Sequence, residues 1–251
     1  MIAEALNFAA TWPVTGPENR AHIRSSVNLW ARARRCASAW KAHEENCHKA
    51  VAIKAGGLRL RRTVVVLGSG LVRDVPIMAL AQKFDTVVLI DRVHLASVRA
   101  WLSWKKLDNV RLIERDLSGT DDLLAGRAPE PLAFLRQVPY LDLVISANLI
   151  SQIALGVGAR LEGQAPGQLP QDAVAQLVAA HIDGLFALPC TPLLLTDTAF
   201  SIIDHSGHVH ERSELLAGVT PPKPFGAWDW TLAPPGEESP DYRIVHHVIA
   251  A

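Results

Sequence analysis

The sequence predicts an α/β fold with a mostly parallel sheet, and two observations carry this prediction. Short apolar runs such as TVVVL at 63–67 and TVVLI at 86–90 have the composition of strands buried on both faces. Helical segments alternate with these runs, as in βαβ units, whose strands lie parallel and whose crossovers are right-handed. The remaining expected strands are VRLI at 110–113, LDLVIS at 141–146 and LLLT at 193–196.

Helices are expected between the strands. The first of them opens at Asp74, the candidate N-cap, with Pro76 in its first turn. Two longer helices are expected over 95–107 and 172–188. The last third of the chain predicts antiparallel pairs instead. These pairs are a small ribbon of 200–204 and 209–211 around the turn His205-Ser206-Gly207, and a terminal hairpin of 228–233 and 242–250.

The first 62 residues predict an N-terminal helical cap that precedes a domain of residues 63–251. Residues 21–55 hold no Pro or Gly and are rich in Ala, Arg and Lys, so we expect a helix that ends at Gly56. Trp12, Trp30 and Trp40 make this cap a candidate lid over a substrate, although single tryptophans usually pack in a core.

The charge balance hides an asymmetry between these two parts. The chain of 251 residues has 25 Lys+Arg and 25 Asp+Glu, and this zero net charge argues against a purely electrostatic nucleic-acid binder. However, residues 1–62 carry 11 basic and 4 acidic side chains, whereas residues 63–251 carry 14 and 21. The cap therefore either docks on the acidic domain or supplies cations to an anionic acceptor.

Cysteine usage and hydropathy predict the cellular compartment of the protein. Three cysteines without a CxxC pair indicate a reducing cytoplasm. No run approaches the roughly 18 apolar residues of a membrane-spanning helix. We therefore expect a cytoplasmic protein with no membrane partner, and its relatively apolar surface is compatible with a homodimer.

A glycine turn and three polar positions follow the first four strands. Gly68 and Gly70 permit a tight turn and let a ligand approach the backbone, although such turns also occur without a ligand. Asp91 lies 21 residues after Gly70, where a carboxylate can accept hydrogen bonds from both ribose hydroxyls of a nucleoside, or cap a helix. Asp116 and Asn148 end the next two strands, where each can meet a polar ligand group or close a local turn.

In order along the chain, VVVLGSG, LIDRVHL, RLIERDLSG and DLVISANLISQ resemble the class I S-adenosylmethionine (SAM)-dependent methyltransferase family over about residues 60–250. The resemblance implies a seven-stranded Rossmann-like sheet in the order 3-2-1-4-5-7-6, with strand 7 antiparallel, and SAM as the cofactor. By position, it implies that Gly68, Ser69 and Gly70 line the methionine moiety, that Asp91 with Arg92 holds the ribose, that Asp116 with Leu117 meets the adenine, and that Asn148 faces the methyl donor or the acceptor.

The sequence departs from the family pattern in two places. The acidic residue usual just before the glycines is absent, since Val65-Val66-Leu67 stands there, and the usual third glycine is Val72. An NAD-dependent oxidoreductase is a weaker alternative, because Arg73 stands where the last glycine of G-x-G-x-x-G would be.

We therefore expect a SAM-dependent methyltransferase that acts on an oxygen or nitrogen of a small molecule. The alternative is an RNA or protein methyltransferase, or an inactive SAM-binding partner, that docks through the basic helix; nucleic acid is compatible but not favoured. Asn148, Asp197 and His205 are the candidates for handling the acceptor, where a base can remove a proton. His208 and His210 crowd the same turn as His205, but a metal site is not favoured there.

Overall fold

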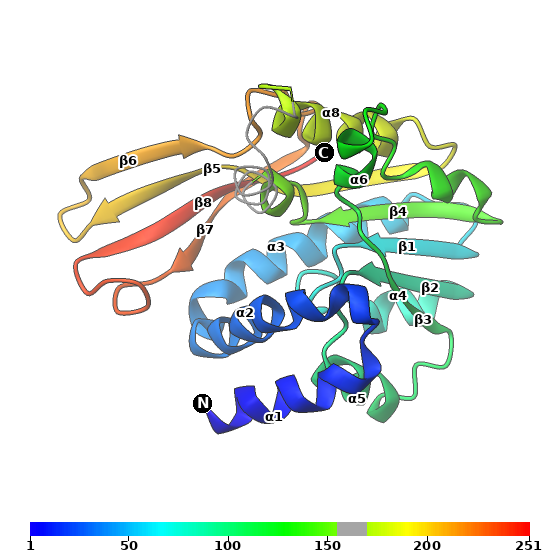
Figure 1. The fold of residues 1–251 in the computed structure, drawn as a ribbon, viewed down its shortest axis with the longest axis horizontal. Helices are drawn as coiled ribbons and strands as arrows, with labels where there is room; N and C mark the ends of the chain where they lie inside the picture. The colour runs from blue at the N-terminus through cyan, green and yellow to red at the C-terminus, as the bar shows by residue number, and fades with distance from the viewer. Residues whose placement is uncertain (155–169) are drawn as a thin grey trace.

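The computed structural model describes residues 1–154 and 170–251. One sheet crosses the molecule, in the order β3-β2-β1-β4-β5-β8-β7, and β6 pairs with β5 outside this path (Figure 1). The strands are β1 (Thr63–Leu67), β2 (Thr86–Asp91), β3 (Val110–Glu114), β4 (Leu141–Ala147), β5 (Thr191–Asp204), β6 (Val209–Glu214), β7 (Gly226–Ala233) and β8 (Tyr242–Ala250).

This order confirms the sheet that the resemblance implies. Strands β1 to β5 pair in parallel, whereas β8 is antiparallel to both β5 and β7. Strands β8 and β7 thus take the places of the seventh and sixth strands. Strand β6 is an additional one, and its antiparallel pairing with β5 confirms the predicted ribbon.

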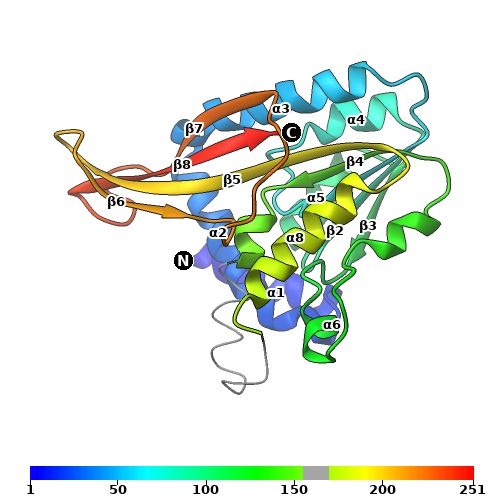
Figure 2. The ribbon, with the colours of Figure 1, turned by 90° about the horizontal axis from the view of Figure 1, so that it is seen from above.

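Helices cover both faces of the sheet (Figure 2). Successive side chains of a strand point to opposite faces. Val64 and Val66 of β1 accordingly join the core under α3, α4 and α5, whereas Val65 and Leu67 join the core under α8. The helices are α1 (Ile2–Thr11), α2 (Ile23–Arg35), α3 (Ala37–Gly56), α4 (Ile77–Lys83), α5 (Ala96–Trp104), α6 (Thr120–Leu124) and α8 (Ala173–Phe186), and short 3-10 helices span Trp12–Val14, Pro17–His22 and Ala133–Gln137.

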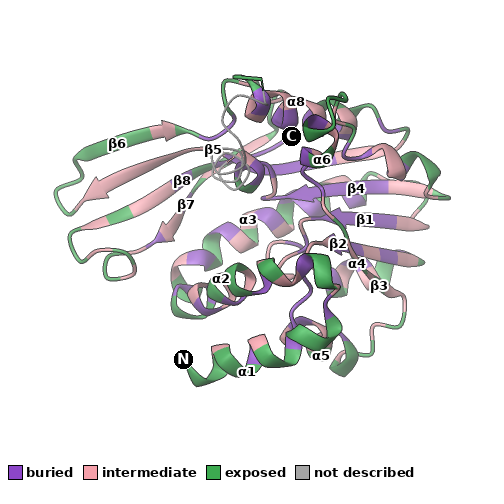
Figure 3. Cartoon of the chain, in the orientation of Figure 1, coloured by how far each residue is buried: buried purple, intermediate pink, exposed green. Residues whose placement is uncertain are grey.

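The central strands are buried, and the distal ribbon is more exposed (Figure 3). The cap helices also contribute to the core, since Val27 of α2 and Val51 of α3 pack in the same cluster as Val64. The division of the chain at residue 62 stays a prediction. No helix in the described parts of the chain is long and apolar enough to cross a membrane.

The structure corrects three local predictions. Residues 193–196 and 200–204 are not separate strands, because β8 pairs along β5 from Leu195 to Asp204 and holds it as one strand of 14 residues. The helix predicted over 21–55 is divided at Cys36, where Cys36 packs with Trp40 and Trp230. A tertiary contact thus breaks a helix that no local residue would stop.

The third correction concerns Asp74, the predicted N-cap. Helix α4 begins only at Ile77, with Pro76 before it and no side-chain cap. The Asp74 carboxylate instead accepts a hydrogen bond from Asn148 Nδ2 at 2.8 Å. Asp74 therefore bonds to Asn148, which follows β4, and does not cap α4. This contact makes Asp74 part of the candidate site described below.

Candidate functional site

A cavity of about 350 Å³ lies at the carboxyl ends of β1 and β4, beside Asp197 in the middle of β5. This is the edge of a parallel sheet where ligands bind in α/β proteins, and the volume is in the range of small-molecule sites. The glycine turn after β1 and the segment after β4 form one side. Trp230 of β7 and His246 of β8 form the other, and residues of α2 line the cavity together with Trp40.

Gly68 holds the turn after β1 close to the end of β4. Its φ is +70°, and a Cβ atom at this position would lie 2.9 Å from the carbonyl oxygen of Ala147. The Gly68 N–H donates to the carbonyl of Ile90 at 2.9 Å, which ties the turn to β2. Only glycine fits this conformation and this approach. The usual third glycine is replaced by Val72, which adopts a φ of 55°.

Asp91 closes the turn from the side of β2. Its Oδ2 accepts the Gly70 N–H at 2.7 Å, and its Oδ1 accepts the Arg92 N–H at 2.7 Å. Burial raises the pKa of Asp91, although these backbone hydrogen bonds oppose the shift. A carboxylate has about four acceptor positions, so both oxygens retain capacity for further donors.

Asp116 and Arg92 form an ion pair at the ends of β3 and β2. Asp116 Oδ1 also accepts the Ser118 N–H at 2.8 Å, and Arg92 Nη1 lies 2.6 Å from Nε2 of His22 in the N-terminal segment. Burial opposes ionisation of Asp116, but the bonds from Arg92 and Ser118 hold its pKa below the usual value. Leu117 is buried in the core. These groups contact one another, and none of them lines the cavity.

Asn148 lies at the centre of the cavity wall in a strained backbone conformation, with a φ of 48°. Its N–H donates to the carbonyl of Leu195 at 2.8 Å, which fixes the segment after β4 against β5. Its Nδ2 faces Asp74, because an ionised carboxylate can only accept. Its Oδ1 is buried and has no partner among the described residues.

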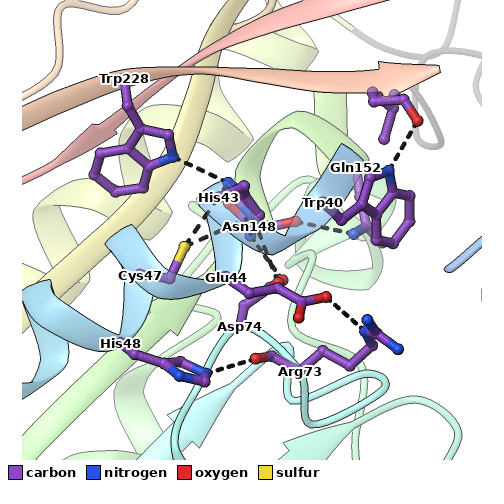
Figure 4. Close-up of polar contacts among 11 residues, drawn as sticks. Trp40, His43, Glu44, Cys47, His48, Arg73, Asp74, Asn148, Gln152 and Trp228 are labelled. Carbon is purple, nitrogen blue, oxygen red and sulfur yellow. Dashed lines mark hydrogen bonds and ion pairs between the residues drawn. The ribbon is translucent and has the colours of Figure 1, made fainter. Parts of the chain in front are cut away.

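His43 of α3 contacts the Asp74 carboxylate (Figure 4). Trp228 Nε1 donates to His43 Nδ1 at 3.0 Å. An indole N–H is only a donor, so Nδ1 is unprotonated and the imidazole proton resides on Nε2. That atom lies 3.5 Å from Asp74 Oδ1. Burial alone would raise the pKa of Asp74, but hydrogen bonds from His43 and Asn148 keep it below the usual value.

Helix α3 also fixes the residue before Asp74. Glu44 Oε1 accepts from Arg73 Nε at 2.6 Å, and His48 Nε2 donates to the Arg73 carbonyl at 2.7 Å (Figure 4). Burial raises the pKa of the Cys47 thiol, which contacts the His43 ring and stays neutral. The loop with Asp74 is thus held in place by side chains of α3, and not by an N-cap bond to α4, the helix that follows it.

Asp197 and His246 form a buried pair on the opposite wall of the cavity. His246 Nδ1 lies 2.5 Å from Asp197 Oδ2, and the other carboxylate oxygen has no partner among the described residues. The indole of Trp230 contacts the His246 ring, and its Nε1 also lacks a partner in the described chain. Buried polar groups normally find partners, so a bound molecule with polar groups would complete this wall.

His205, the third candidate for handling the acceptor, is not brought to the cavity. It is exposed at the turn between β5 and β6, where its Nε2 contacts the carbonyl of Pro240 at 2.8 Å. The nearby Asp204 accepts hydrogen bonds from His210 Nε2 at 2.8 Å and from the Ser206 hydroxyl at 2.7 Å. Among the three candidates, only Asn148 and Asp197 share the cavity.

Sequence reasoning missed part of this site, namely His43, Asp74, Trp228, Trp230 and His246. One signal was available for His43, which interrupts an otherwise apolar stripe on its helix and is only 1% exposed. A buried histidine requires partners, and that requirement points to a polar network. No comparable signal existed for the other four, because their partners come from distant strands and loops.

The basic cap is paired with acidic residues at this end of the molecule. Arg32, which lines the cavity, and Arg35 form ion pairs with Glu237, and Arg32 also contacts Glu238 in the loop between β7 and β8. Part of the positive charge of residues 1–62 is therefore matched within the chain. These pairs also tie α2, which lines the cavity, to the loop between β7 and β8.

Comparison with protein-family models and with curated proteins finds no match. Among solved structures, the chain is similar to the N-methyltransferase NodS of Bradyrhizobium japonicum in complex with S-adenosylhomocysteine, with 10% identity, a TM-score of 0.36, and coverage of 82% of this chain and 85% of that one. It is similar to an rRNA methylase of Streptococcus thermophilus, with 18% identity, a TM-score of 0.37, and coverage of 80% and 94%.

A Bacillus halodurans protein assigned as a methyltransferase is also similar, with 15% identity, a TM-score of 0.34 and coverage of 62% of this chain. The chain spans only 52% of the length of that protein. Likenesses at this level carry no conclusion about a substrate, so the functional argument depends on the strand order and the cavity.

Proposed function

We propose that this chain, which has the sheet order of the class I methyltransferases, is a SAM-dependent methyltransferase that acts on a small molecule. The observation that carries the proposal is the cavity at the glycine turn, where Ser69 Oγ and Asn148 Oδ1 are buried without partners in the described chain. A ligand seated on this turn would satisfy both atoms. SAM, when bound, would supply the electrophilic methyl group.

The residues present fit this cofactor. Gly68 leaves the turn open to a ligand, and Asp91 keeps acceptor capacity toward ribose hydroxyls. Asp116 has free lone pairs besides its bonds to Arg92 and Ser118, so it would accept from an adenine amino group after a shift of Arg92. By contrast, the NAD alternative gives no role to Asp116 or Asn148.

The far wall supports a small acceptor. Asp197 Oδ1 is a buried acceptor and Trp230 Nε1 a buried donor, and apolar side chains of Leu29, Trp40 and Leu232 surround them. We expect Asp197, held by His246, to orient the acceptor and to accept the hydrogen bond of the N–H or O–H group that is methylated. The cavity volume of about 350 Å³ favours a small molecule over a polymer.

Isothermal titration tests the cofactor, with SAM, S-adenosylhomocysteine and NAD as ligands. We expect binding of the first two and none of NAD; absence of SAM binding at high micromolar concentration would contradict the proposal. Transfer of a labelled methyl group to a panel of alcohols, phenols and amines then tests the acceptor. We expect Asp197→Asn to reduce transfer at least about tenfold while the affinity for S-adenosylhomocysteine is retained.

The same protein tests the alternative of an RNA acceptor. Arg32 and Arg35 are committed to Glu237 and Glu238, and Arg34 lies over the ring of Trp30, so we expect weak RNA binding. Salt-sensitive RNA binding that is lost when the three arginines are neutralised would instead favour an RNA methyltransferase.

A further inference from the structure

The wall of the cavity opposite the glycine turn holds a buried carboxylate with one free oxygen. Asp197 is 3% exposed, and its Oδ2 lies 2.5 Å from Nδ1 of His246. Its Oδ1 is buried and has no partner in the described chain, and both residues line the cavity. Buried polar groups normally have partners, and an ionised carboxylate can only accept hydrogen bonds. The free oxygen therefore requires a donor from a bound molecule.

No arginine or lysine in the described parts of the chain compensates this carboxylate. Arg32 and Arg73 also line the cavity, but Arg32 is paired with two glutamates and Arg73 with one. Neither arginine forms an ion pair with Asp197 or with Asp74, the other aspartate of the cavity. A buried charge without a counterion is costly, so a cationic ligand would stabilise this wall. Anionic acceptors, such as carboxylates and phosphates, would be repelled.

Aromatic rings lie beside the carboxylate. Trp40 and Trp230 line the cavity, and their rings stand nearly perpendicular, at 78°, with centroids 5.1 Å apart. The ring of Trp230 also lies 5.8 Å from the ring of His246, the partner of Asp197. Aromatic rings attract cations, and proteins hold methylated ammonium groups among such rings. This surroundings suits an ammonium group both before and after it gains a methyl group.

We propose that the methyl acceptor is an amine, which binds as an alkylammonium ion to Asp197. This inference rests on the proposed function, in which the cofactor occupies the side of the glycine turn. An ammonium group offers up to three donors and carries the charge that complements the carboxylate. A hydroxyl group offers one donor and leaves the buried charge uncompensated. The chemistry of the wall thus favours nitrogen over oxygen as the methylated atom.

Methyl transfer requires that the nitrogen first lose a proton. Asp197 Oδ1 accepts one proton from the ammonium group, and this frees the lone pair of the nitrogen. The lone pair then forms a bond to the methyl carbon while the bond between that carbon and the sulfonium sulfur breaks. The products are a methylated ammonium ion and S-adenosylhomocysteine, and Asp197 afterwards releases its proton to water.

The test compares amines with alcohols of the same carbon skeleton, titrated into the full-length chain saturated with S-adenosylhomocysteine. The probes are phenethylamine with phenethyl alcohol, cyclohexylmethylamine with cyclohexylmethanol, and hexylamine with hexanol. For the skeleton that binds most tightly, the amine should bind about 10- to 100-fold more tightly than the alcohol, as expected for hydrogen bonds to a charged group. Phenylacetate, which has the opposite charge, should not bind.

Substitution of Asp197 should remove the preference for amines. In Asp197→Asn, the ratio of the amine and alcohol affinities should fall to near one, because the amide has no charge, while S-adenosylhomocysteine still binds. Asp229→Asn is the matched control, since Asp229 lies on β7 with a side chain that is 74% exposed, and it should keep the wild-type ratio. An unchanged ratio in Asp197→Asn would overturn the assignment.

Two variants of His246 keep the test decisive if Asp197→Asn folds poorly. His246→Asn retains an N–H group near the position of Nδ1 and should keep most of the preference for amines. His246→Leu removes the hydrogen bond to Asp197 and lets the carboxylate turn away, so the ratio should fall by about 3- to 10-fold. A wild-type ratio in His246→Leu would contradict the proposed geometry.

The remaining outcomes separate this inference from the proposed function. If the wild-type protein does not bind S-adenosylhomocysteine, the cofactor assignment fails and the acceptor assignment fails with it. If it binds S-adenosylhomocysteine but binds alcohols as tightly as amines, the proposed function survives and the amine acceptor is overturned. With labelled SAM and an equimolar mixture of each amine and its alcohol, the N-methyl product should predominate. A predominant O-methyl product would assign the site to a hydroxyl group instead.

Discussion

The two halves of the candidate site differ in how their polar groups are satisfied. In the half formed by the cavity, Ser69 and Asn148 at the glycine turn and Asp197 on the opposite wall each keep a buried oxygen without a partner in the described chain. At the half formed by the ends of β2 and β3, Asp91 and Asp116 are bonded to backbone N–H groups and to Arg92. The free acceptors of the first half are available to a ligand. In the second half, a ligand has to replace hydrogen bonds that already exist.

The N-terminal segment accounts for part of this difference. Gly16 donates its N–H to Glu114 Oε2 at 3.0 Å, and His22 lies against Arg92. The segment therefore packs across the end of β3 beside the second half. The first half is covered by α2 and α3, which present their own side chains to the cavity wall.

The largest expected effect comes from Gly68→Ala, which disrupts the first half. The new Cβ atom would lie 2.9 Å from the Ala147 oxygen at a φ of +70°. We expect S-adenosylhomocysteine affinity to fall roughly 100-fold or more by titration. Gly126→Ala is the control, since its φ is +69° but nothing lies within 4 Å of the added atom. Equal effects of both variants would show that backbone strain, not the close approach, matters.

A smaller effect is expected from Asp91→Asn, which acts at the junction of the halves. The amide loses the charge that accepts the Gly70 N–H and, in our proposal, the ribose hydroxyls. We expect a 10- to 100-fold lower affinity for SAM, in the range of charged hydrogen bonds. Asp85→Asn, an exposed aspartate at the other end of β2, should bind SAM as the wild type does. Unchanged affinity in Asp91→Asn would refute the ribose assignment.

Arg92→Met tests whether the ion pair between Arg92 and Asp116 in the second half has to break before a ligand binds. The ion pair with Asp116 competes with any ligand that would contact this carboxylate. We expect faster association of S-adenosylhomocysteine, by about tenfold, because the variant removes a pair that has to be broken. Stopped-flow measurement of tryptophan fluorescence follows this rate. A slower association would mean that Arg92 guides the ligand rather than blocking it.

The smallest effect on binding is expected at His181, which lies outside both halves. His181 Nε2 contacts the Ser146 hydroxyl at 2.9 Å, and burial lowers the pKa of His181 to about 4. Between about pH 6.5 and 4, His181 is therefore protonated in the unfolded chain but neutral in the folded chain. The free energy of unfolding consequently falls as the pH falls from about 6.5 toward 4.

The loss of stability from this group amounts to roughly 3 kcal/mol at most. Urea unfolding across this pH range should show a weaker dependence in His181→Gln, whereas His205→Gln, an exposed control, should resemble the wild type. Affinity for SAM near pH 7.5 should be the same in all three proteins. An unaltered pH dependence in His181→Gln would contradict the burial argument.

The sequence predicted the fold well because its signals are local. β-branched runs, a glycine turn and the alternation of strands with helices define the order of elements, and the resemblance supplied the strand order. Both were confirmed, including the antiparallel strand β8. The break at Cys36 and the full length of β5 were missed, since contacts with Trp230 and pairing with β8 decide them.

By itself, the sequence determined the α/β sheet and the positions at its carboxyl edge, because hydrophobic periodicity and turn chemistry act between neighbouring residues. Only the tertiary structure decided which polar groups meet there. His43, Asp74 and Trp228 come from α3, the loop before α4 and β7, and no spacing in the chain relates them. Their contact depends on how the cap packs against the sheet. Once they are buried, water no longer replaces a lost hydrogen bond, so each of these bonds matters for the arrangement of the site.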